Sequence, residues 1–414
     1  MSREAECRAP RSTPGRRAAE QSGAVVQIAA EVPQQVITGE IGRTLAEMEL
    51  GCPPAVTRAL YGALGGGELG YLAAADVAQL QDAVGGWLAD AYGWEPQRAA
   101  IRPVSDLVAG FRAVLTHLLP AGQPIIVPTP GYMPFISMPG QIDHPVIEVP
   151  MLRDAGGWHY DFEALRAAFA AGARLLVLCN PHNPIGKVAT AAELDRIEEL
   201  VAEYDGIVFS DEIHAPLVLG ERQHTVYAAR SARAAAHTIT ATSATKAFNI
   251  PGTKCGQLVF TNPDHLARWL EIGHWHEHQT SVLGVVATSA AYGGGREWLA
   301  ETVAYLRGTI AEAVALLDAA AARTGIRVIR PDATYLLWLD LSETALLRDD
   351  VSAAQAVREA AGLVVTDGSE CGAAGRGAVR FNAALPRPVT LEAMRRLIAA
   401  AESAGTQRAH TNRG

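Results

Sequence analysis

Residues 174–214 read RLLVLCNPHNPIGKVATAAELDRIEELVAEYDGIVFSDEIH, and they give the strongest indication of the fold class. Residues 174–179 form a nearly continuous apolar run, which is typical of a strand buried on both faces of a sheet. Residues 190–204 have the spacing of an amphipathic helix, with a Thr at the start that can cap it. A second apolar strand follows at residues 206–210. This order predicts a helix that connects two parallel strands.

The same alternation of strands and helices extends on both sides of this stretch. A helix is expected at residues 73–92, with Trp87 on its apolar side. We predict an α/β fold with a mostly parallel sheet, covered by helices on both faces, whose ligands bind at the carboxyl ends of the strands. Further strands are expected at residues 124–128, 146–149, 238–242 and 257–260.

The pattern changes after about residue 283. Long Ala-rich helices there are followed by strands near Ile326, Tyr335 and Val379 and by a closing helix from Thr390. These elements predict a second, smaller α+β domain. The expected division is a flexible leader (1–35), an N-terminal segment that joins the small domain (36–60), a large ligand-binding domain (61–285) and a small C-terminal domain (286–414).

Composition and charge narrow the classes of function. Of the 414 residues, 49% are hydrophobic and 19% are charged, which provides ample core material for a globular protein. The net charge of −9 argues against nucleic-acid binding. No apolar run is long enough to span a membrane and no apolar stretch follows the basic N-terminus, so we expect a cytoplasmic protein. The five scattered cysteines include no C-x-x-C pair and indicate neither a disulfide framework nor a zinc site.

Three polar segments follow directly after predicted strands. Each has an ordinary structural interpretation when it is taken alone. An N-P-x-N-P-x-G stretch is a strong turn former. An Asp at a strand end is usually a helix cap or a solvated carboxylate, and a single Lys is usually a surface charge. Their order and their common placement favour a functional site instead. The segments are NPHNPIG (180–186), SDEIH (210–214) and SATKAFNIPG (243–252).

These motifs, together with DATYLLWLDL (332–341) and GAVRFNAALPR (377–387), carry a resemblance to a known family. The chain resembles fold-type I pyridoxal 5′-phosphate (PLP) enzymes of the aminotransferase class I/II superfamily. It is most similar to the MalY/PatB-type cystathionine β-lyase (C–S lyase) branch, from about Gly39 to the final helix. The resemblance implies a PLP-dependent transferase-like fold with a seven-stranded type of sheet, PLP as the cofactor, and a small amino-acid substrate.

The resemblance assigns a role to each residue around the cofactor ring. Lys246 matches the Schiff-base lysine, whose amine later acts as base or acid at the substrate Cα. Asp211 matches the carboxylate that pairs with the pyridine nitrogen and keeps the ring protonated. Asn183 and His214 match donors to the 3′-oxygen, and Tyr132 matches the aromatic side chain that stacks on the ring. A capped or solvated His214, and a Tyr132 that only packs in its loop, stay open as alternatives.

The resemblance also implies a set of phosphate ligands. Ser243 and Lys254 match phosphate ligands by their spacing from the lysine that carries the cofactor. Residues 104–110 match a loop that presents backbone amides at a helix N-terminus, with Ser105, Asp106 and Leu107 as candidates. A carboxylate repels phosphate, so we expect Asp106 to point away or to cap the helix.

Subunit and substrate contacts follow from the same resemblance. Tyr71 matches a tyrosine that reaches the phosphate in the neighbouring subunit, which implies a homodimer with shared active sites. Arg380 matches the arginine that binds the substrate α-carboxylate, with Asn183 beside it; its alternative is a strand arginine in a surface salt bridge. Tyr335 is expected to line the side-chain pocket or to pack beneath it.

Three departures from the family pattern concern the substrate. They lie at LAEMELGCPP (45–54), at HWHEHQT (274–280) and at Cys371. We expect all three near the substrate, which points away from plain cystathionine and towards a bulky S-cysteine conjugate. The H-x-H-x-H pattern invites a metal, but no acid or Cys cluster completes it, so we expect no metal site.

Three reactions share every motif, and the sequence alone does not separate them. The first choice is α,β-elimination from an S-substituted cysteine by a C–S β-lyase, because His214 and Lys254 follow the habit of that branch. The alternatives are an aminotransferase and an oxidative or decarboxylative deaminase of an S-conjugated cysteine in secondary metabolism. A regulatory, non-enzymatic role is disfavoured by the complete set of PLP residues.

Overall fold

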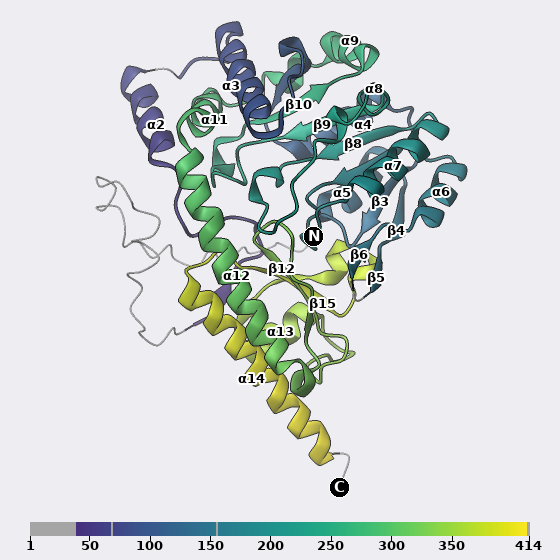
Figure 1. The fold of residues 1–414 in the computed structure, drawn as a ribbon, viewed down its shortest axis with the longest axis vertical. Helices are drawn as coiled ribbons and strands as arrows, with labels where there is room; N and C mark the ends of the chain where they lie inside the picture. The colour runs from purple at the N-terminus through teal and green to yellow at the C-terminus, as the bar shows by residue number, and fades with distance from the viewer. Residues whose placement is uncertain (1–38, 68, 155, 412–414) are drawn as a thin grey trace, which may run out of the picture.

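The computed structural model describes residues 39–67, 69–154 and 156–411 (Figure 1). The expected flexible leader, residues 1–35, lies outside the described residues. The described chain forms a seven-stranded sheet, a four-stranded sheet and two short two-stranded pairs. No helix in this part combines the length and the apolar character needed to cross a lipid bilayer.

The seven-stranded sheet confirms the predicted α/β fold. β10 runs antiparallel to both of its neighbours, and the remaining strand pairs of this sheet are parallel. Each predicted strand of this region is present to within about one residue. The order across the sheet is β2 (Ile101–Val104), β10 (Gly256–Phe260), β9 (Thr238–Thr242), β8 (Ile207–Asp211), β7 (Leu175–Cys179), β3 (Ile125–Thr129) and β4 (Val146–Pro150).

Alternating side chains of the central strands divide between two apolar clusters. In β7, Leu175 and Val177 belong to the cluster that contains residues of α4 and α9. Leu176 and Leu178 belong to the cluster that contains residues of α6 and α7. Because successive side chains of a strand point to opposite faces, this division buries both faces of the sheet, as the apolar run predicts.

Helices cover both faces of this sheet in Figure 1. The predicted helix after β7 is present, and Thr190 caps it: its hydroxyl accepts a hydrogen bond from the Glu193 amide while the Glu193 carboxylate accepts one from the Thr190 amide. The helices of this part are α2 (Pro54–Gly66), α3 (Ala74–Tyr92), α4 (Leu107–Leu118), α5 (Met133–Ser137), α6 (Phe162–Ala170), α7 (Ala191–Glu203), α8 (Ala232–Ala236), α9 (Pro263–Ile272), α10 (His274–Glu277) and α11 (Val282–Gly294).

The second part of the molecule is an antiparallel sheet with three helices. Its sheet has the order β11 (Arg327–Val328), β12 (Leu336–Asp340), β15 (Ala378–Asn382) and β14 (Thr366–Asp367). Figure 1 shows the long helices α12 (Arg296–Thr324) and α14 (Arg387–Thr411) packed side by side along it, with α13 (Ala353–Ala361) nearby.

The N-terminal chain contacts both parts. Strand β1 (Ile41–Gly42) pairs in parallel with β13 (Leu363–Val364) of the second part, whereas α2 packs against α11 of the first. The four-way division of the chain stays a prediction.

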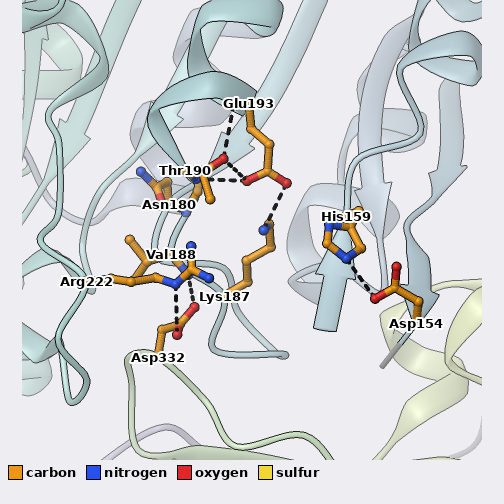
Figure 2. Close-up of polar contacts among 10 residues, drawn as sticks. Asp154, His159, Asn180, Lys187, Val188, Thr190, Glu193, Arg222 and Asp332 are labelled. Carbon is orange, nitrogen blue, oxygen red and sulfur yellow. Dashed lines mark hydrogen bonds and ion pairs between the residues drawn. The ribbon is translucent and has the colours of Figure 1, made fainter. Parts of the chain in front are cut away.

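Polar contacts fasten the loop after β7 to the second part (Figure 2). The Asp332 carboxylate accepts a hydrogen bond from the Val188 amide at 3.2 Å and pairs with Arg222 at 3.3 Å. Asn180 accepts a hydrogen bond from the Ala189 amide at 3.0 Å, and Lys187 pairs with Glu193 at 2.9 Å. The loop that carries Asn183 is therefore held rigidly. Figure 2 also shows the small hairpin of β5 (Leu152–Asp154) and β6 (Gly157–His159), which a contact between His159 and Asp154 closes.

Candidate active site

A cavity of about 1010 Å³ lies at the carboxyl ends of the parallel strands. The loops that follow β2, β3, β7, β8 and β9 all contribute to its wall, as expected for a ligand site in an open α/β sheet. Eleven of the thirteen residues proposed from the sequence line it: Ser105, Asp106, Leu107, Tyr132, Asn183, Asp211, His214, Ser243, Lys246, Lys254 and Arg380.

Lys246 lies in the loop after β9, largely buried in the cavity wall. Its Nζ donates a hydrogen bond to the backbone oxygen of Ala46 at 2.9 Å. Burial lowers the pKa of this amine, and the Glu47 carboxylate partly opposes that effect. A lowered pKa favours the neutral amine, which is the form that acts as a nucleophile or a base.

Asp211 is the last residue of β8 and is 4% exposed. One carboxylate oxygen accepts a hydrogen bond from the Ile213 amide at 3.2 Å. The pKa of Asp211 is raised to about 7, chiefly because burial disfavours its charged form. A buried carboxylate that forms no ion pair with any described residue suits a ligand that brings its own cation.

Asn183 and His214 stand at the ends of neighbouring strands, β7 and β8. His214 is buried, its Nδ1 has no hydrogen-bond partner among the described residues, and burial lowers its pKa to about 3. It is therefore a neutral imidazole in the wall rather than a capped or solvated surface side chain. Tyr132, at the start of α5, is half-buried and packs edge-on against Phe135 with ring centroids 5.4 Å apart.

His182, which lies between Asn180 and Asn183 in the same loop, has no role in the sequence analysis. Its Nε2 is 2.8 Å from the backbone oxygen of Pro130, so it ties the loop after β7 to the loop after β3. Burial lowers its pKa to about 4, which keeps it neutral. Its only sequence signal is its position between two Asn-Pro pairs.

The N-terminus of α4 forms one end of the cavity. Asp106 caps this helix, because its carboxylate accepts a hydrogen bond from the Ala109 amide at 2.8 Å. Of the two placements expected from the sequence, pointing away or capping the helix, the structure shows the cap. Lys254 Nζ lies 3.1 Å from the same carboxylate, in a half-exposed ion pair. Because exposed pairs contribute only about 0–1 kcal/mol, Lys254 can exchange this partner for another anion at little cost.

Ser243 lies beside this end of the cavity and is buried. Its Oγ is 2.8 Å from the backbone oxygen of Cys255 and 2.9 Å from Oγ1 of Thr245. Free amides of a helix N-terminus, a lysine and hydroxyl groups form a donor set of the kind that binds phosphate groups in proteins.

Arg380 enters the cavity from β15 of the second part and is only 3% exposed. Its guanidinium donates to Oδ1 of Asn183 at 3.0 Å, to the backbone oxygen of Thr44 at 2.8 Å and to Oγ1 of Thr366 at 3.1 Å. These acceptors and a fourth, the Met133 sulfur at 3.7 Å, are neutral, and no described carboxylate forms an ion pair with Arg380. A surface salt bridge is therefore not its role. A buried cation without a counter-ion is costly, which suits a site that binds an anion.

Residues 44–47 form a strap across the cavity, so the start of the segment 45–54 lies in the cavity wall, where a substrate contact is expected from the sequence. The Ala46 oxygen accepts hydrogen bonds from both Lys246 and the Tyr335 hydroxyl, each at 2.9 Å. Asn382 donates to the backbone oxygens of Leu45 and Glu47. Tyr335 is fully buried and packs beneath the cavity rather than lining it.

Tyr71 does not reach the cavity of its own chain. It is 86% exposed and stacks on His278, with ring centroids 5.2 Å apart. From the neighbouring segment, His276 and Gln279 do line the cavity, and Nε2 of His276 lies 3.0 Å from Nε2 of His117.

The segment 274–280 is anchored through Glu277. Arg102 donates to both of its carboxylate oxygens, at 2.7 and 2.6 Å, and Trp269 donates to one of them at 2.7 Å. In the described chain, no three His, Cys, Asp or Glu side chains gather where they could hold a metal ion. Cys371 is fully buried and does not line the cavity, so the expectation of a substrate contact there does not fit.

Comparison with known proteins identifies the family. The model described as aminotransferase class I and II matches residues 42–398. The chain belongs to this family.

Relatives confirm the resemblance to the lyase branch of this family. A cystathionine β-lyase of Corynebacterium glutamicum is 33% identical over 353 residues, which are 85% of this chain and 91% of the relative. The cystathionine β-lyase PatB of Bacillus subtilis is 30% identical over 368 residues, or 88% of this chain and 93% of PatB. Among solved structures, cystalysin from Treponema denticola, which contains a PLP cofactor, superposes with a TM-score of 0.82 at 25% identity. That match covers 95% of this chain and 98% of cystalysin.

Proposed function

We propose that this protein is a PLP-dependent C–S β-lyase that removes the sulfur substituent from an S-substituted cysteine by α,β-elimination. The observation that carries the proposal is one cavity that contains a buried lysine, a buried carboxylate without a cation, and a buried arginine without an anion. The names of the relatives, which are cystathionine β-lyases, support the same reaction.

The residues around the cavity fit PLP. Lys246 would hold the cofactor covalently, Asp211 its ring nitrogen, and Asn183 and His214 its 3′-oxygen, with Tyr132 against the ring. The phosphate would take the end of the cavity where α4 begins, with backbone amides of Ser105, Asp106 and Leu107 and the side chains of Ser105, Ser243 and Lys254 as ligands. When bound, PLP supplies an electron sink that stabilises negative charge at the substrate Cα.

The chain's own groups then orient the substrate and move its protons. Arg380 binds the α-carboxylate with two parallel hydrogen bonds, and the neighbouring Asn183 amide restricts how that carboxylate can turn. Lys246 takes the proton from Cα, because its lowered pKa makes the neutral amine available. The Cβ–S bond breaks, the thiolate leaves and takes up a proton, and one water is consumed. The products are a thiol, pyruvate and ammonia.

We also propose that the active enzyme is a homodimer with shared active sites. Large apolar side chains are exposed on and just after α2 and on α10, and the stack of Tyr71 on His278 brings these two regions together. Tyr71 is too far from its own cavity to line it, so it can serve the phosphate only from a partner subunit. The apolar side chains are Tyr61, Leu64, Leu69, Tyr71 and Trp275. Light scattering of the active protein tests this, and an active monomer would contradict it. A cytoplasmic location stays a prediction.

Product identification tests the proposed reaction. The protein loaded with PLP is incubated with a panel of S-substituted cysteines, and the products are identified by mass spectrometry. Pyruvate together with the free thiol is expected. A keto acid that keeps its sulfur would indicate an aminotransferase, and an aldehyde with carbon dioxide would indicate an oxidative or decarboxylative enzyme. Either result would overturn the proposal.

A further inference from the structure

Three acids line the cavity, and one of them has no partner. Asp211 stands at the end of β8, and Asp106 caps α4 and pairs with Lys254. The Glu47 carboxylate, on the strap, forms no hydrogen bond and no ion pair with any described residue. A carboxylate in a cavity that makes no structural contact is available to a ligand.

The strap fixes where this carboxylate lies. The Glu47 backbone oxygen accepts a hydrogen bond from Asn382 at 2.7 Å. The next residue is held from the other side, since Asn249 accepts from the Met48 amide and donates to the Met48 oxygen, each at 2.9 Å. Met48 is itself buried. Because both neighbouring peptides are fastened, the backbone that carries Glu47 is held at the cavity wall.

The neighbours of Glu47 are the groups proposed to act on the substrate. Lys246 donates to the backbone oxygen of Ala46, one residue before Glu47, and Arg380 donates to the strap at Thr44. In the proposed reaction, Arg380 is taken by the α-carboxylate and Lys246 by the cofactor and the Cα proton. Two further cations line the cavity: Arg112 lies on α4, and Lys254 pairs with Asp106 at the N-terminus of that helix, where the phosphate is proposed to bind. Glu47 is then left without a cation, next to the space that the substrate side chain must use.

From this arrangement we propose that Glu47 is a specificity-determining residue that binds a cationic group on the sulfur substituent. The preferred substrates are S-substituted cysteines that carry an ammonium group beyond the sulfur atom. A neutral substituent of the same size would cover the carboxylate without offering it a partner, which is unfavourable. The inference rests on the proposed function and extends it to the substrate class.

The test compares two substrates of equal size on the enzyme loaded with PLP. S-(2-aminoethyl)-cysteine and S-propyl-cysteine differ by an ammonium in place of a methyl group. The rate of thiol release gives kcat/KM for each, and wild type is expected to favour the aminoethyl compound by about tenfold, the lower end for a charge-assisted hydrogen bond. In Glu47→Gln the ratio of the two kcat/KM values should fall to near one, whatever happens to their absolute values.

Glu49→Gln is the matched control. Glu49 lies two residues further along the same segment, is exposed, and pairs with Arg43 at 2.7 Å outside the cavity. The substrate ratio of Glu49→Gln should equal that of wild type. A binding measurement without turnover provides a second readout: in a Lys246→Ala background, calorimetry should give the same preference for the aminoethyl compound, and Glu47→Gln should remove it.

The possible results distinguish a failure of the proposed lyase function from a failure of the inference about Glu47. If wild type releases no thiol from either compound, the proposed lyase function fails. If it releases thiol from both with equal kcat/KM, or if Glu47→Gln leaves the ratio unchanged, the function stands and the inference is wrong. If Glu47→Gln lowers both values by the same factor, Glu47 serves Lys246 rather than the substituent, and the inference is again overturned.

Discussion

The two ends of the cavity are built in different ways. At the sheet end, Asp211 and Lys246 stand on or just after the parallel strands β8 and β9, so a short motif fixes each position. At the strap end, the site is made by contacts between residues more than 330 positions apart, such as Arg380 with Thr44 and Asn382 with Leu45. The comparison suggests that the sheet end sets the chemistry and that the strap end sets which substrate is held.

A second contrast lies within the sheet end, between two neighbouring acids. Asp211 and Glu212 are equally buried, at 4% and 3% exposure. Glu212 accepts hydrogen bonds from the Ser210 hydroxyl, the Tyr227 amide and His224, whereas the best donor to Asp211 is one backbone amide at 3.2 Å. A buried carboxylate whose oxygens accept several hydrogen bonds is typical of a structural role. A buried carboxylate with few hydrogen bonds is typical of a ligand site.

The largest effect is expected at Lys246. Lys246→Ala removes both the attachment point and the proposed base, so kcat should fall by more than about 10⁴-fold. Borohydride reduction of wild type followed by peptide mass spectrometry should locate the pyridoxyl label on Lys246. A label on another lysine would contradict the assignment of this end of the cavity.

Asp211→Asn should lower kcat by about 10²-fold or more while the protein keeps its shape, because the electron sink loses the charge that supports it. Glu212→Gln is the matched variant. This substitution weakens the hydrogen bonds of Glu212 with Ser210, Tyr227 and His224. Its main effect should be a lower thermal midpoint of unfolding, with little change in kcat. If the two variants behaved alike in steady-state kinetics and in thermal unfolding, the contrast between the two acids would be lost.

At the strap end, Arg380→Lys replaces a planar fork by a point charge. The expected loss is about 10- to 100-fold in kcat/KM, seen mainly as a higher KM, because hydrogen bonds to a charged group are weakened. Arg327 lies on β11 and forms an exposed ion pair with Glu343, so Arg327→Lys should leave the kinetics unchanged. A loss confined to kcat would place Arg380 with the chemistry instead of the binding.

The smallest effect concerns stability and pH. The pKa of Asp211 in the folded chain, about 7, exceeds its ordinary value of 3.8. The folded protein without cofactor therefore binds this proton more tightly than the unfolded chain, and its stability should fall as pH rises from about 4 to 7. Asp211→Asn should flatten this part of the curve of thermal midpoint against pH. A wild-type midpoint that rises through the window with the same slope as the variant would contradict the assigned cause.

The sequence predicted the sheet end well because strands and motifs are local in the chain. The apolar run of β7 and the capping Thr190 specify their elements without help from distant residues. For the strap, the sequence indicated a segment near the substrate but not its contacts, because its backbone oxygens accept hydrogen bonds from residues just before β12, in β15 and in the loop after β9 that lie far away in the chain. Cys371 was expected near the substrate and is buried instead, because its side chain belongs to the apolar cluster of α6 and α7 and its backbone oxygen accepts a hydrogen bond from the Gly131 amide at 2.8 Å. The role proposed for Tyr71 requires a second subunit, and the described chain shows only that this side chain is exposed and stacks on His278.

The most direct test of the account is a count of turnovers without any keto acid. The protein loaded with PLP is mixed with an excess of S-(2-aminoethyl)-cysteine alone, and thiol, pyruvate and ammonia are measured over time. Elimination predicts many turnovers per active site, with the three products in equal amounts. A reaction that stops after one turnover per active site, with sulfur retained in a keto acid, would contradict it.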